Sequence, residues 1–360
     1  MPEKSMALPQ ARFKEFIQNG EEPFIYEKNV LCQHWDKVKS IIKGEKTTPY
    51  EIELQSTSLC NLHCKHCVGV AHKPSEATEI TPERMKTIIC QIAKMGGVKR
   101  VKFSGYYGEP LMNKKSTLLG INMAKKKRMK VGLFTNGVLI DEGVIDTLMK
   151  AEYVNISLDA GSRESYLKLK GSDHFGRVIS NIRLLDAIRK ERNSRLEITV
   201  GYILNKHNYK EIPDIIKILI GYVDMIRFKA NILNSDMTKD ELDEAYRLIG
   251  ESKKYESNRF KIISIHSRLD AERMQKPTFN RCYFLNLMGC IGCDGKPYPC
   301  DHKTYFGGDK KDLVPKDDCE LCPPMGFRVN RFLEFMEQEY KKDPKFLDWV
   351  EGFINGEINS

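Results

Sequence analysis

The sequence contains no long apolar run. Nowhere in its 360 residues do the roughly 18–20 consecutive apolar residues occur that a membrane-spanning helix requires. The first residues, MPEKSMALPQARFKEF, also lack the apolar segment of a secretory signal. We therefore expect no transmembrane helix and a cytoplasmic protein.

Signs of secretion are missing, yet the chain has 11 cysteines. An odd number cannot all be paired, and a reducing compartment disfavours structural disulfides. Ligation of a metal ion or an iron–sulfur cluster is the remaining use for so many thiols. Low-complexity segments are absent too, as are repeats beyond an alternation of strands and helices. A hydrophobic content of 41% with 30% charged residues is typical of an ordinary soluble globular protein.

The charge is mildly basic, at +9. Its densest run, Lys125-Lys126-Lys127-Arg128, falls where a helix is expected to end, and cations there complement the helix dipole. We therefore do not expect nucleic acid as a partner, nor a membrane.

From residue 50 onward, strand-like segments alternate with helical patterns, one of which begins with Thr81 as N-cap and Pro82 at the first helical position. Such alternation predicts right-handed crossovers and a parallel sheet. Because six units are too few for a closed eightfold barrel, we expect an α/β fold, a partial (β/α)6 barrel. The six predicted strands are 50–55, 100–105, 130–137, 153–160, 197–204 and 225–231.

One face of these strands is polar and the other apolar. Since helices cover the outside of such a barrel, the apolar face is expected outward and the polar face toward the lumen. A polar lumen indicates a cavity for a polar ligand; the alternative is that these residues are strand ends in solvent. The polar set is Glu53, Gln55, Lys102, Ser104, Asn155, Ser157, Asp159, Arg227 and Lys229.

The flanking segments differ from the barrel. Helical patterns closed by Gly20 and Gly44 precede it, and a capping box from Thr238 to Glu241 begins a helix after it. Asp294-Gly295 predicts a two-residue hairpin turn within a cysteine-rich stretch. The expected organisation is an N-terminal helical extension (1–49), the barrel (50–235), a linking helix region (236–275), a cysteine-rich module (276–325) and a helical tail (326–360).

The segment SLCNLHCKHC places Cys60, Cys64 and Cys67 in the loop after the first strand. Three thiolates so close together can reach three corners of a [4Fe–4S] cube and leave one iron without a protein ligand. The alternative is a zinc site, which needs a fourth ligand from a histidine. The candidates for that ligand are His63, His66 and His72.

Across residues 50–235 the chain resembles the radical S-adenosylmethionine (radical SAM) superfamily. The cysteine spacing matches the family signature, FSGYYGEP (103–110) is similar to its glycine–glutamate motif, and TNG (135–137) ends the third strand. The fifth strand, VGYILNKHN, lacks the family's glycine-rich pattern. By this resemblance the cofactor-binding residues are Gly105, Gly108, Glu109, Asn136, Ser157 and Asp159.

The resemblance also implies roles and a chemistry. Gly105 and Gly108 would let the backbone approach the cofactor, Glu109 would face its ammonium group, and Ser157 and Asp159 would meet its carboxylate or ribose. A [4Fe–4S] cluster would bind S-adenosylmethionine and cleave it to a 5′-deoxyadenosyl radical that abstracts hydrogen from a substrate. An external electron donor, a flavodoxin or ferredoxin, would be needed.

The C-terminal cysteines allow two four-thiolate sets. Cys282, Cys300, Cys319 and Cys322, with Gly295 five residues before Cys300, resemble the auxiliary-cluster modules called SPASM and twitch, which implies an auxiliary [4Fe–4S] cluster. The alternative is a zinc-ribbon-like site that pairs Cys290 and Cys293 with the last two cysteines. In the first case Cys290 and Cys293 are packed thiols or ligands of a further cluster. Two other cysteines, Cys32 and Cys90, are expected to be buried or incidental.

The leading hypothesis is a radical SAM oxidoreductase that oxidises a polar small molecule with help from the auxiliary cluster. The predicted cations of the lumen (Lys102, Arg227 and Lys229) suit a polyol, an amino sugar, or a phosphorylated or carboxylated substrate. The alternatives are a peptide-modifying maturase, an epimerase, and, more remotely, a non-catalytic zinc-ribbon or electron-transfer protein. The catalytic residues and the substrate are not identified by the sequence, because specificity lies in the loops that cover the barrel.

Overall fold

The computed structural model of the 360-residue chain forms two compact units, each built from separate stretches of sequence. The larger unit is Thr48–Leu269 with Leu287–Asp312, and the smaller is Met1–Thr47 with Asp270–Asn286 and Leu313–Ser360. The structure describes residues 9–10, 13, 34–45, 47–67, 76–106, 108–230, 236–265, 278–298, 300 and 324–358.

The larger unit is built on an open nine-stranded sheet in the order β7-β6-β5-β4-β3-β2-β1-β8-β9. All neighbouring strands are parallel except β8 and β9. The strands are β1 (Glu51–Gln55), β2 (Arg100–Ser104), β3 (Lys130–Thr135), β4 (Tyr153–Ser157), β5 (Glu197–Leu204), β6 (Met225–Ala230), β7 (Lys261–Ile265), β8 (Met288–Ile291) and β9 (Pro297–Tyr298).

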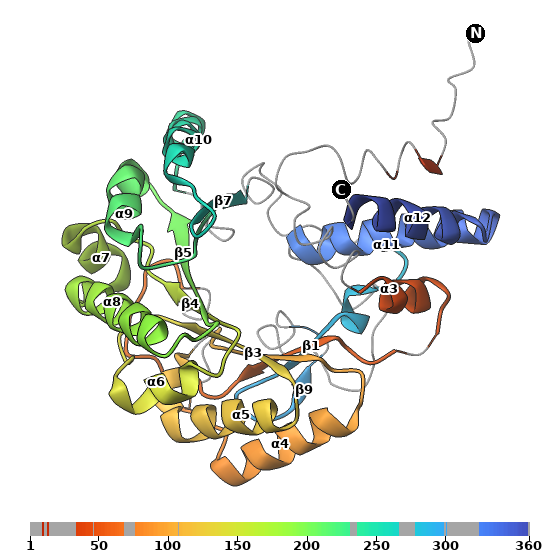
Figure 1. Ribbon diagram of the computed structural model, residues 1–360, viewed down its shortest axis with the longest axis horizontal. Helices are drawn as coiled ribbons and strands as arrows, with labels where there is room; N and C mark the ends of the chain where they lie inside the picture. Colours follow the sequence, from red (N-terminus) through yellow and green to blue (C-terminus); the bar gives the residue numbers. More distant parts are fainter. Residues whose placement is uncertain are drawn as a thin grey trace. The chain divides into compact units, whose positions relative to one another are not determined.

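Helices cover the outer side of this curved sheet (Figure 1). The alternating apolar residues of the strands are buried against them, among them Leu54, Phe103, Val154 and Phe228, each fully buried. The helices are α4 (Pro82–Lys94), α5 (Lys114–Lys126), α6 (Glu142–Leu148), α7 (Arg163–Lys170), α8 (Phe175–Glu191), α9 (Ile212–Leu219) and α10 (Lys239–Ser252). Short 3₁₀ helices are η3 (Pro110–Asn113), η4 (Tyr209–Glu211) and η5 (Lys253–Tyr255).

The predicted α/β open barrel and its six parallel strands are confirmed. The predicted caps are also confirmed, because Thr81 accepts a hydrogen bond from the Arg84 amide and Thr238 forms a capping box with Glu241. Two features of the sheet were not predicted. A further strand, β7, pairs with β6, and β8 pairs with β1 on the other side of the sheet.

The hairpin of β8 and β9 is present, but its connection is longer than predicted. Strand β8 ends at Ile291 and β9 begins at Pro297, so residues 292–296 form the loop instead of Asp294-Gly295 alone. Gly295 takes a positive φ of 71°, and the Gly292 and Lys296 backbones bond across the loop. Because β8 and β9 belong to the sheet, part of the predicted cysteine-rich module falls in the larger compact unit. The domain boundaries expected from the sequence stay a proposal.

The smaller unit is helical among its described residues. Helix α3 (Trp35–Ile42) ends before Gly44, whose φ of 75° suits a glycine, as predicted. Aromatic rings hold this unit together, since Phe13 contacts Phe332, Phe346, Trp349 and Phe353 at centroid distances of 5.5–6.3 Å. Its other helices are η7 (Phe284–Asn286), α11 (Pro324–Lys342) and α12 (Phe346–Ile358). Most of the predicted helix that Gly20 closes lies outside the described residues.

Within the described part of the chain, no helix is both long and apolar enough to cross a bilayer.

Candidate functional site

The three-cysteine loop leaves the carboxyl end of β1 and is described as far as residue 67. Cys60, Cys64 and Cys67 are each partly buried. Burial raises the pKa of Cys64 to about 11, against the opposing charge of Lys170. The three thiols thus lie on one short loop at the strand end where parallel sheets place their sites.

The loop is fixed to the end of helix α7. The His63 amide donates to the Lys170 carbonyl at 3.2 Å, and the Lys65 amide donates to the Leu169 carbonyl at 2.9 Å. Carbonyls in the last turn of a helix lack helical partners, so these bonds satisfy both segments. Gly171 ends the helix at φ 69°, and a Cβ there would lie 3.1 Å from the His63 carbonyl oxygen, which leaves little room for a side chain.

A buried charged network connects the same loop to β4 and β5. Asp159 accepts hydrogen bonds from the Lys170 ammonium and, at 2.7 Å, from the Ile203 amide, and it contacts His66 Nε2 at 3.2 Å. The side chains of Asp159 and Lys170 are each 3% exposed. Although burial alone would raise the pKa of Asp159, the charge of Lys170 and the contact with His66 hold it well below its usual range.

This network bears on the predicted role of Asp159. Both carboxylate oxygens already have protein partners, and the residue takes a positive φ of 54° after β4. Asp159 therefore has a structural role, because it joins Lys170 to the Ile203 amide. Its predicted contact with the cofactor ribose or carboxylate stays a prediction.

The glycine loop after β2 packs directly on the cysteine loop. A Cβ at Gly105 would lie 1.6 Å from the Gly108 carbonyl oxygen, and one at Gly108 would lie 2.1 Å from the Thr57 carbonyl oxygen. The Glu109 amide also donates to the Leu59 carbonyl at 2.7 Å. The two glycines thus allow backbone to approach backbone, whereas the sequence suggested an approach to the cofactor, which stays a prediction.

Glu109 is buried at the start of η3, with 3% of the residue exposed. One carboxylate oxygen accepts from the Leu111 amide at 3.1 Å and from the Thr135 hydroxyl at 2.7 Å, and the other accepts from the Asn136 amide at 2.6 Å. Burial raises the pKa of Glu109, while these hydrogen bonds oppose the rise. A carboxylate offers about four acceptor positions, so one remains for a ligand ammonium group.

Asn136 joins the end of β3 to the cysteine loop. Its side-chain amide donates to Asn61 Oδ1 at 2.8 Å, and its own oxygen accepts from the Val138 amide at 3.0 Å. Ser157 is the last residue of β4, partly buried, and pairs in register with Gly201 of β5. Glu109, Asn136 and Ser157 therefore lie at the carboxyl ends of β2, β3 and β4.

The lumen is polar as predicted, but its cations differ in whether carboxylates pair with them. Lys102 forms ion pairs with Glu53 and, at 3.8 Å, with Glu51, so its charge is neutralised within the fold. The prediction that Lys102 adds positive charge for a substrate is therefore wrong. Lys229 lies on the same face of β6 as Arg227, two residues further along the strand.

The second cysteine set is only partly described. Cys282 and Cys300 are partly buried, and Cys319 and Cys322 lie outside the described residues, so the auxiliary cluster and the zinc-ribbon alternative both stay predictions. The Asn330 side chain donates to the Cys282 sulfur at 3.4 Å.

The other cysteines differ in position. Cys290 is buried on β8 beside Glu53, where Gln55 Nε2 donates to its sulfur at 3.7 Å, and Cys293 is buried at the start of the hairpin loop. Cys90 is partly buried on α4, and Cys32 lies outside the described residues.

Among the described residues, no three histidine, cysteine or acidic side chains approach closely enough to hold one metal ion. A zinc ion on the first cysteine loop with His63 or His66 thus finds no closed ligand set there, and His72 lies outside the described residues. A [4Fe–4S] cube needs three thiolates and no histidine from this loop, and Cys60, Cys64 and Cys67 would supply them.

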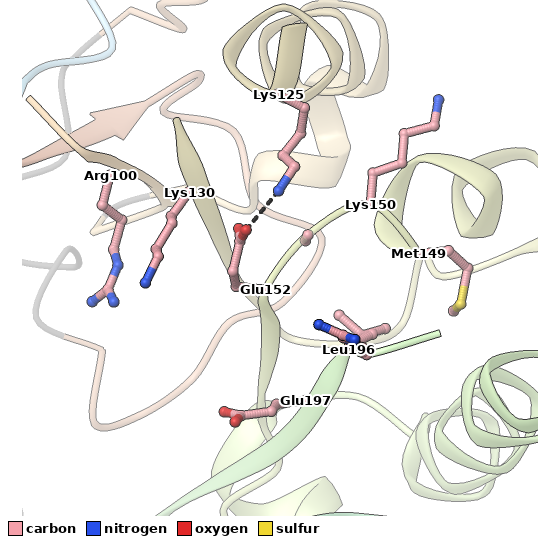
Figure 2. Close-up of a pocket in the computed structure, with 10 residues that line it drawn as sticks. Arg100, Lys125, Lys130, Met149, Lys150, Glu152, Leu196 and Glu197 are labelled. Atoms are coloured by element: carbon pink, nitrogen blue, oxygen red, sulfur yellow. Dashed lines mark hydrogen bonds and ion pairs between the residues drawn. The ribbon is translucent and has the colours of Figure 1, made fainter. Parts of the chain in front are cut away.

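A cavity of about 460 Å³ opens at the opposite ends of the strands. Figure 2 shows its lining residues, with the ion pair between Lys125 and Glu152 at 2.5 Å. Arg100, Lys130 and Glu197 begin β2, β3 and β5, so this cavity lies at the amino ends of the strands, away from the cysteine loop.

Sequence reasoning missed Lys170 and Asn61 as residues of the site. Lys170 reads as an ordinary cation in the last turn of a helix, and nothing in the pattern YLKLKG indicates that it is buried. Asn61 lies inside the cysteine motif, where only the thiols carry a recognisable spacing. His66 was considered solely as a zinc ligand, whereas in the structure it contacts Asp159.

Comparison with known proteins agrees with this arrangement. Residues 54–219 match the Radical SAM superfamily. The chain is 30% identical over 206 residues to Fe-coproporphyrin III synthase of Methanosarcina barkeri, covering 54% of this chain and 49% of the relative. It is 26% identical over 166 residues to PqqA peptide cyclase of Granulibacter bethesdensis, covering 46% and 42%. The chain spans about half the length of these curated relatives.

Among solved structures, the fold is similar to Streptococcus suis SuiB bound to its precursor peptide SuiA, with a TM-score of 0.58 and 16% identity. The match covers 78% of this chain and 65% of SuiB. At this identity the likeness concerns the fold alone.

Proposed function

We propose that this chain is an enzyme that cleaves S-adenosylmethionine and takes a hydrogen atom from a bound substrate, because residues 54–219 match the Radical SAM superfamily. Proteins of this family use a [4Fe–4S] cluster together with S-adenosylmethionine. One observation carries the proposal: the loop with Cys60, Cys64 and Cys67 is bonded directly to the loop with Glu109, through the Glu109 amide and the Leu59 carbonyl at 2.7 Å.

Each residue of the site has its own proposed role. Cys60, Cys64 and Cys67 would hold three irons, and the spare acceptor position of Glu109 would take the ammonium group of S-adenosylmethionine. The loops that carry them are held together by Asn136 and Asn61, and Ser157 would meet the cofactor on β4. When bound, the cluster and S-adenosylmethionine supply the 5′-deoxyadenosyl radical, with an electron from a flavodoxin or ferredoxin.

For the substrate, we propose a peptide. The PqqA peptide cyclase relative and the peptide-bound SuiB structure support this choice, each over part of its length. A second candidate is a polar small molecule, oxidised with an auxiliary cluster on Cys282, Cys300, Cys319 and Cys322. The Fe-coproporphyrin III synthase relative and the polar lumen support that candidate. The distinguishing measurement is the mass of each candidate substrate after turnover.

The proposal predicts that anaerobically reconstituted protein, given S-adenosylmethionine and dithionite, forms 5′-deoxyadenosine and methionine. Iron and sulfide are measured in the same sample, so that loading is known. A fully loaded protein that forms no 5′-deoxyadenosine with any reductant would contradict the proposed function.

Glu109→Gln is expected to keep the cluster but to weaken S-adenosylmethionine binding. The charge-assisted contact with the ammonium group is lost, which typically corresponds to about 1.5–3 kcal/mol, or roughly 10- to 150-fold in affinity. Equilibrium dialysis with labelled S-adenosylmethionine measures the change.

The matched control is Glu211→Gln. That carboxylate also accepts three hydrogen bonds, from the Gly161 amide and the Ser162 and Ser165 hydroxyls, but it holds the start of α7. Equal losses of affinity in both variants would show that Glu109 acts through general stability rather than through the ammonium group.

A further inference from the structure

Two cations of the lumen lie over the same aromatic ring. Lys102 Nζ is 5.5 Å from the centroid of Phe134, and Arg227 Cζ is 5.9 Å from it. They come from β2 and β6, and both extend from the inner face of the sheet. Because they share one environment, their different partners can be compared directly.

The positive charge of Lys102 is compensated by two carboxylates. It forms an ion pair with Glu53, whose carboxylate also accepts from the Ser104 hydroxyl, and a second at 3.8 Å with Glu51. These carboxylates raise the pKa of Lys102 well above its usual value in spite of burial. The charge of this lysine therefore has its partners within the fold.

Arg227 has no such compensation among the described residues. Its Nη2 donates to Asn155 Oδ1 at 2.5 Å, no carboxylate pairs with it, and its buried Nε has no acceptor. The same Asn155 oxygen also accepts from the Thr199 hydroxyl at 3.1 Å. Burial lowers the pKa of Arg227, and the nearby Tyr153 phenol opposes this only in part.

The position of Arg227 connects it to the candidate site. Arg227 pairs in register with Gly201 on β5, and Gly201 pairs with Ser157 on β4. Because Gly201 has no side chain, the arginine reaches Asn155 across β5 without obstruction. The Arg227 backbone is therefore level with Ser157, and its guanidinium group lies beside Asn155, two residues before Ser157 on β4.

We propose that Arg227 binds an anionic group of the substrate, a carboxylate or a phosphate, within the lumen. The planar guanidinium fork matches either anion in a bidentate manner. A desolvated cation without a counter-ion is unfavourable, and an arriving anion would provide that counter-ion. The inference rests on the proposed function, because it places the reacting substrate in the lumen.

The first test is thermal unfolding of the full chain in chloride buffer, comparing Arg227→Met with Lys102→Met. Arg227→Met removes an uncompensated charge and leaves Asn155 with the Thr199 hydroxyl, so the Tm is expected to rise by roughly 2–8 °C. Lys102→Met leaves the Glu53 carboxylate buried without its cation, so the Tm is expected to fall by more than about 5 °C. A fall of the Tm in Arg227→Met would overturn the inference.

The second test adds sodium phosphate or sodium glutarate at constant ionic strength. The wild-type Tm is expected to rise in a saturable manner with at least one of them, and the Arg227→Met Tm is expected to stay unchanged. A response to phosphate alone identifies a phosphorylated small molecule, and a response to glutarate alone a carboxylate, as on an acidic peptide side chain. Either a wild type without response or an equal response in both proteins would overturn the inference.

The third test separates the substrate from the cofactor, which also carries a carboxylate. Arg227→Met is expected to bind S-adenosylmethionine within about threefold of the wild-type affinity. A larger loss would assign Arg227 to the cofactor and overturn the substrate assignment. None of these measurements requires S-adenosylmethionine cleavage, so failure here is distinct from failure of the proposed function.

Discussion

Replacing Cys60, Cys64 and Cys67 together by Ala is expected to abolish 5′-deoxyadenosine formation and to remove about half of the bound iron, if each cysteine set holds one cluster. The thiols lie on a loop whose shape is fixed by backbone bonds to α7 and to the glycine loop. The substitution therefore removes ligands without removing the contacts that order the loop. Iron analysis and the quantity of 5′-deoxyadenosine from one anaerobic preparation measure both effects.

Two control variants locate the remaining iron. Cys319→Ala with Cys322→Ala is expected to lose the other half of the iron while 5′-deoxyadenosine still forms, because the first loop is untouched. Cys90→Ala, at a partly buried thiol on α4, is expected to change neither quantity. Full iron content in the triple variant, or stoichiometric zinc in the Cys319 and Cys322 region, would contradict the assignment of the cysteine sets.

Local patterns in the sequence account for most of the barrel. Alternation between segments such as 197–204 and the helical stretches that follow predicts a parallel sheet, and β5 occupies those residues. The strands β7 and β8 escaped prediction for a physical reason. Strand β8 pairs with β1 across more than 200 residues, and no local pattern in a short segment rich in cysteine and glycine indicates that partner.

The lumen was predictable as polar but not as a set of charges. Glu53 and Lys102 were recognised on one face of the strands. Because β1 and β2 are adjacent parallel strands, the pairing of these two residues in register could have been predicted from the sequence. The buried network of Asp159, Lys170 and His66 was not. It brings together a strand end, a helix end and a loop, and each of the three residues is an ordinary surface type in its own segment.

Lys170→Met is expected to lower the free energy of unfolding by about 3–5 kcal/mol, because it leaves the Asp159 carboxylate buried without its cation. The same change would weaken the cysteine loop, since His66 shares that carboxylate. We therefore expect loss of iron to a chelator to become faster in the reconstituted variant. Urea unfolding of the full chain and the rate of iron release are the two measurements.

Helix α7 itself provides the matched control. Arg163, at its first residue, pairs with Asp173 at an exposed site, with side chains 77% and 44% exposed, so Arg163→Met should change neither measurement appreciably. The double variant Lys170→Met with Asp159→Asn removes both charges and keeps an acceptor for the Ile203 amide. Its loss of stability should therefore be smaller than the sum of the two single losses. Additive losses would show that Lys170 and Asp159 act independently, and an unchanged rate of iron release in Lys170→Met would show that the network does not hold the cysteine loop.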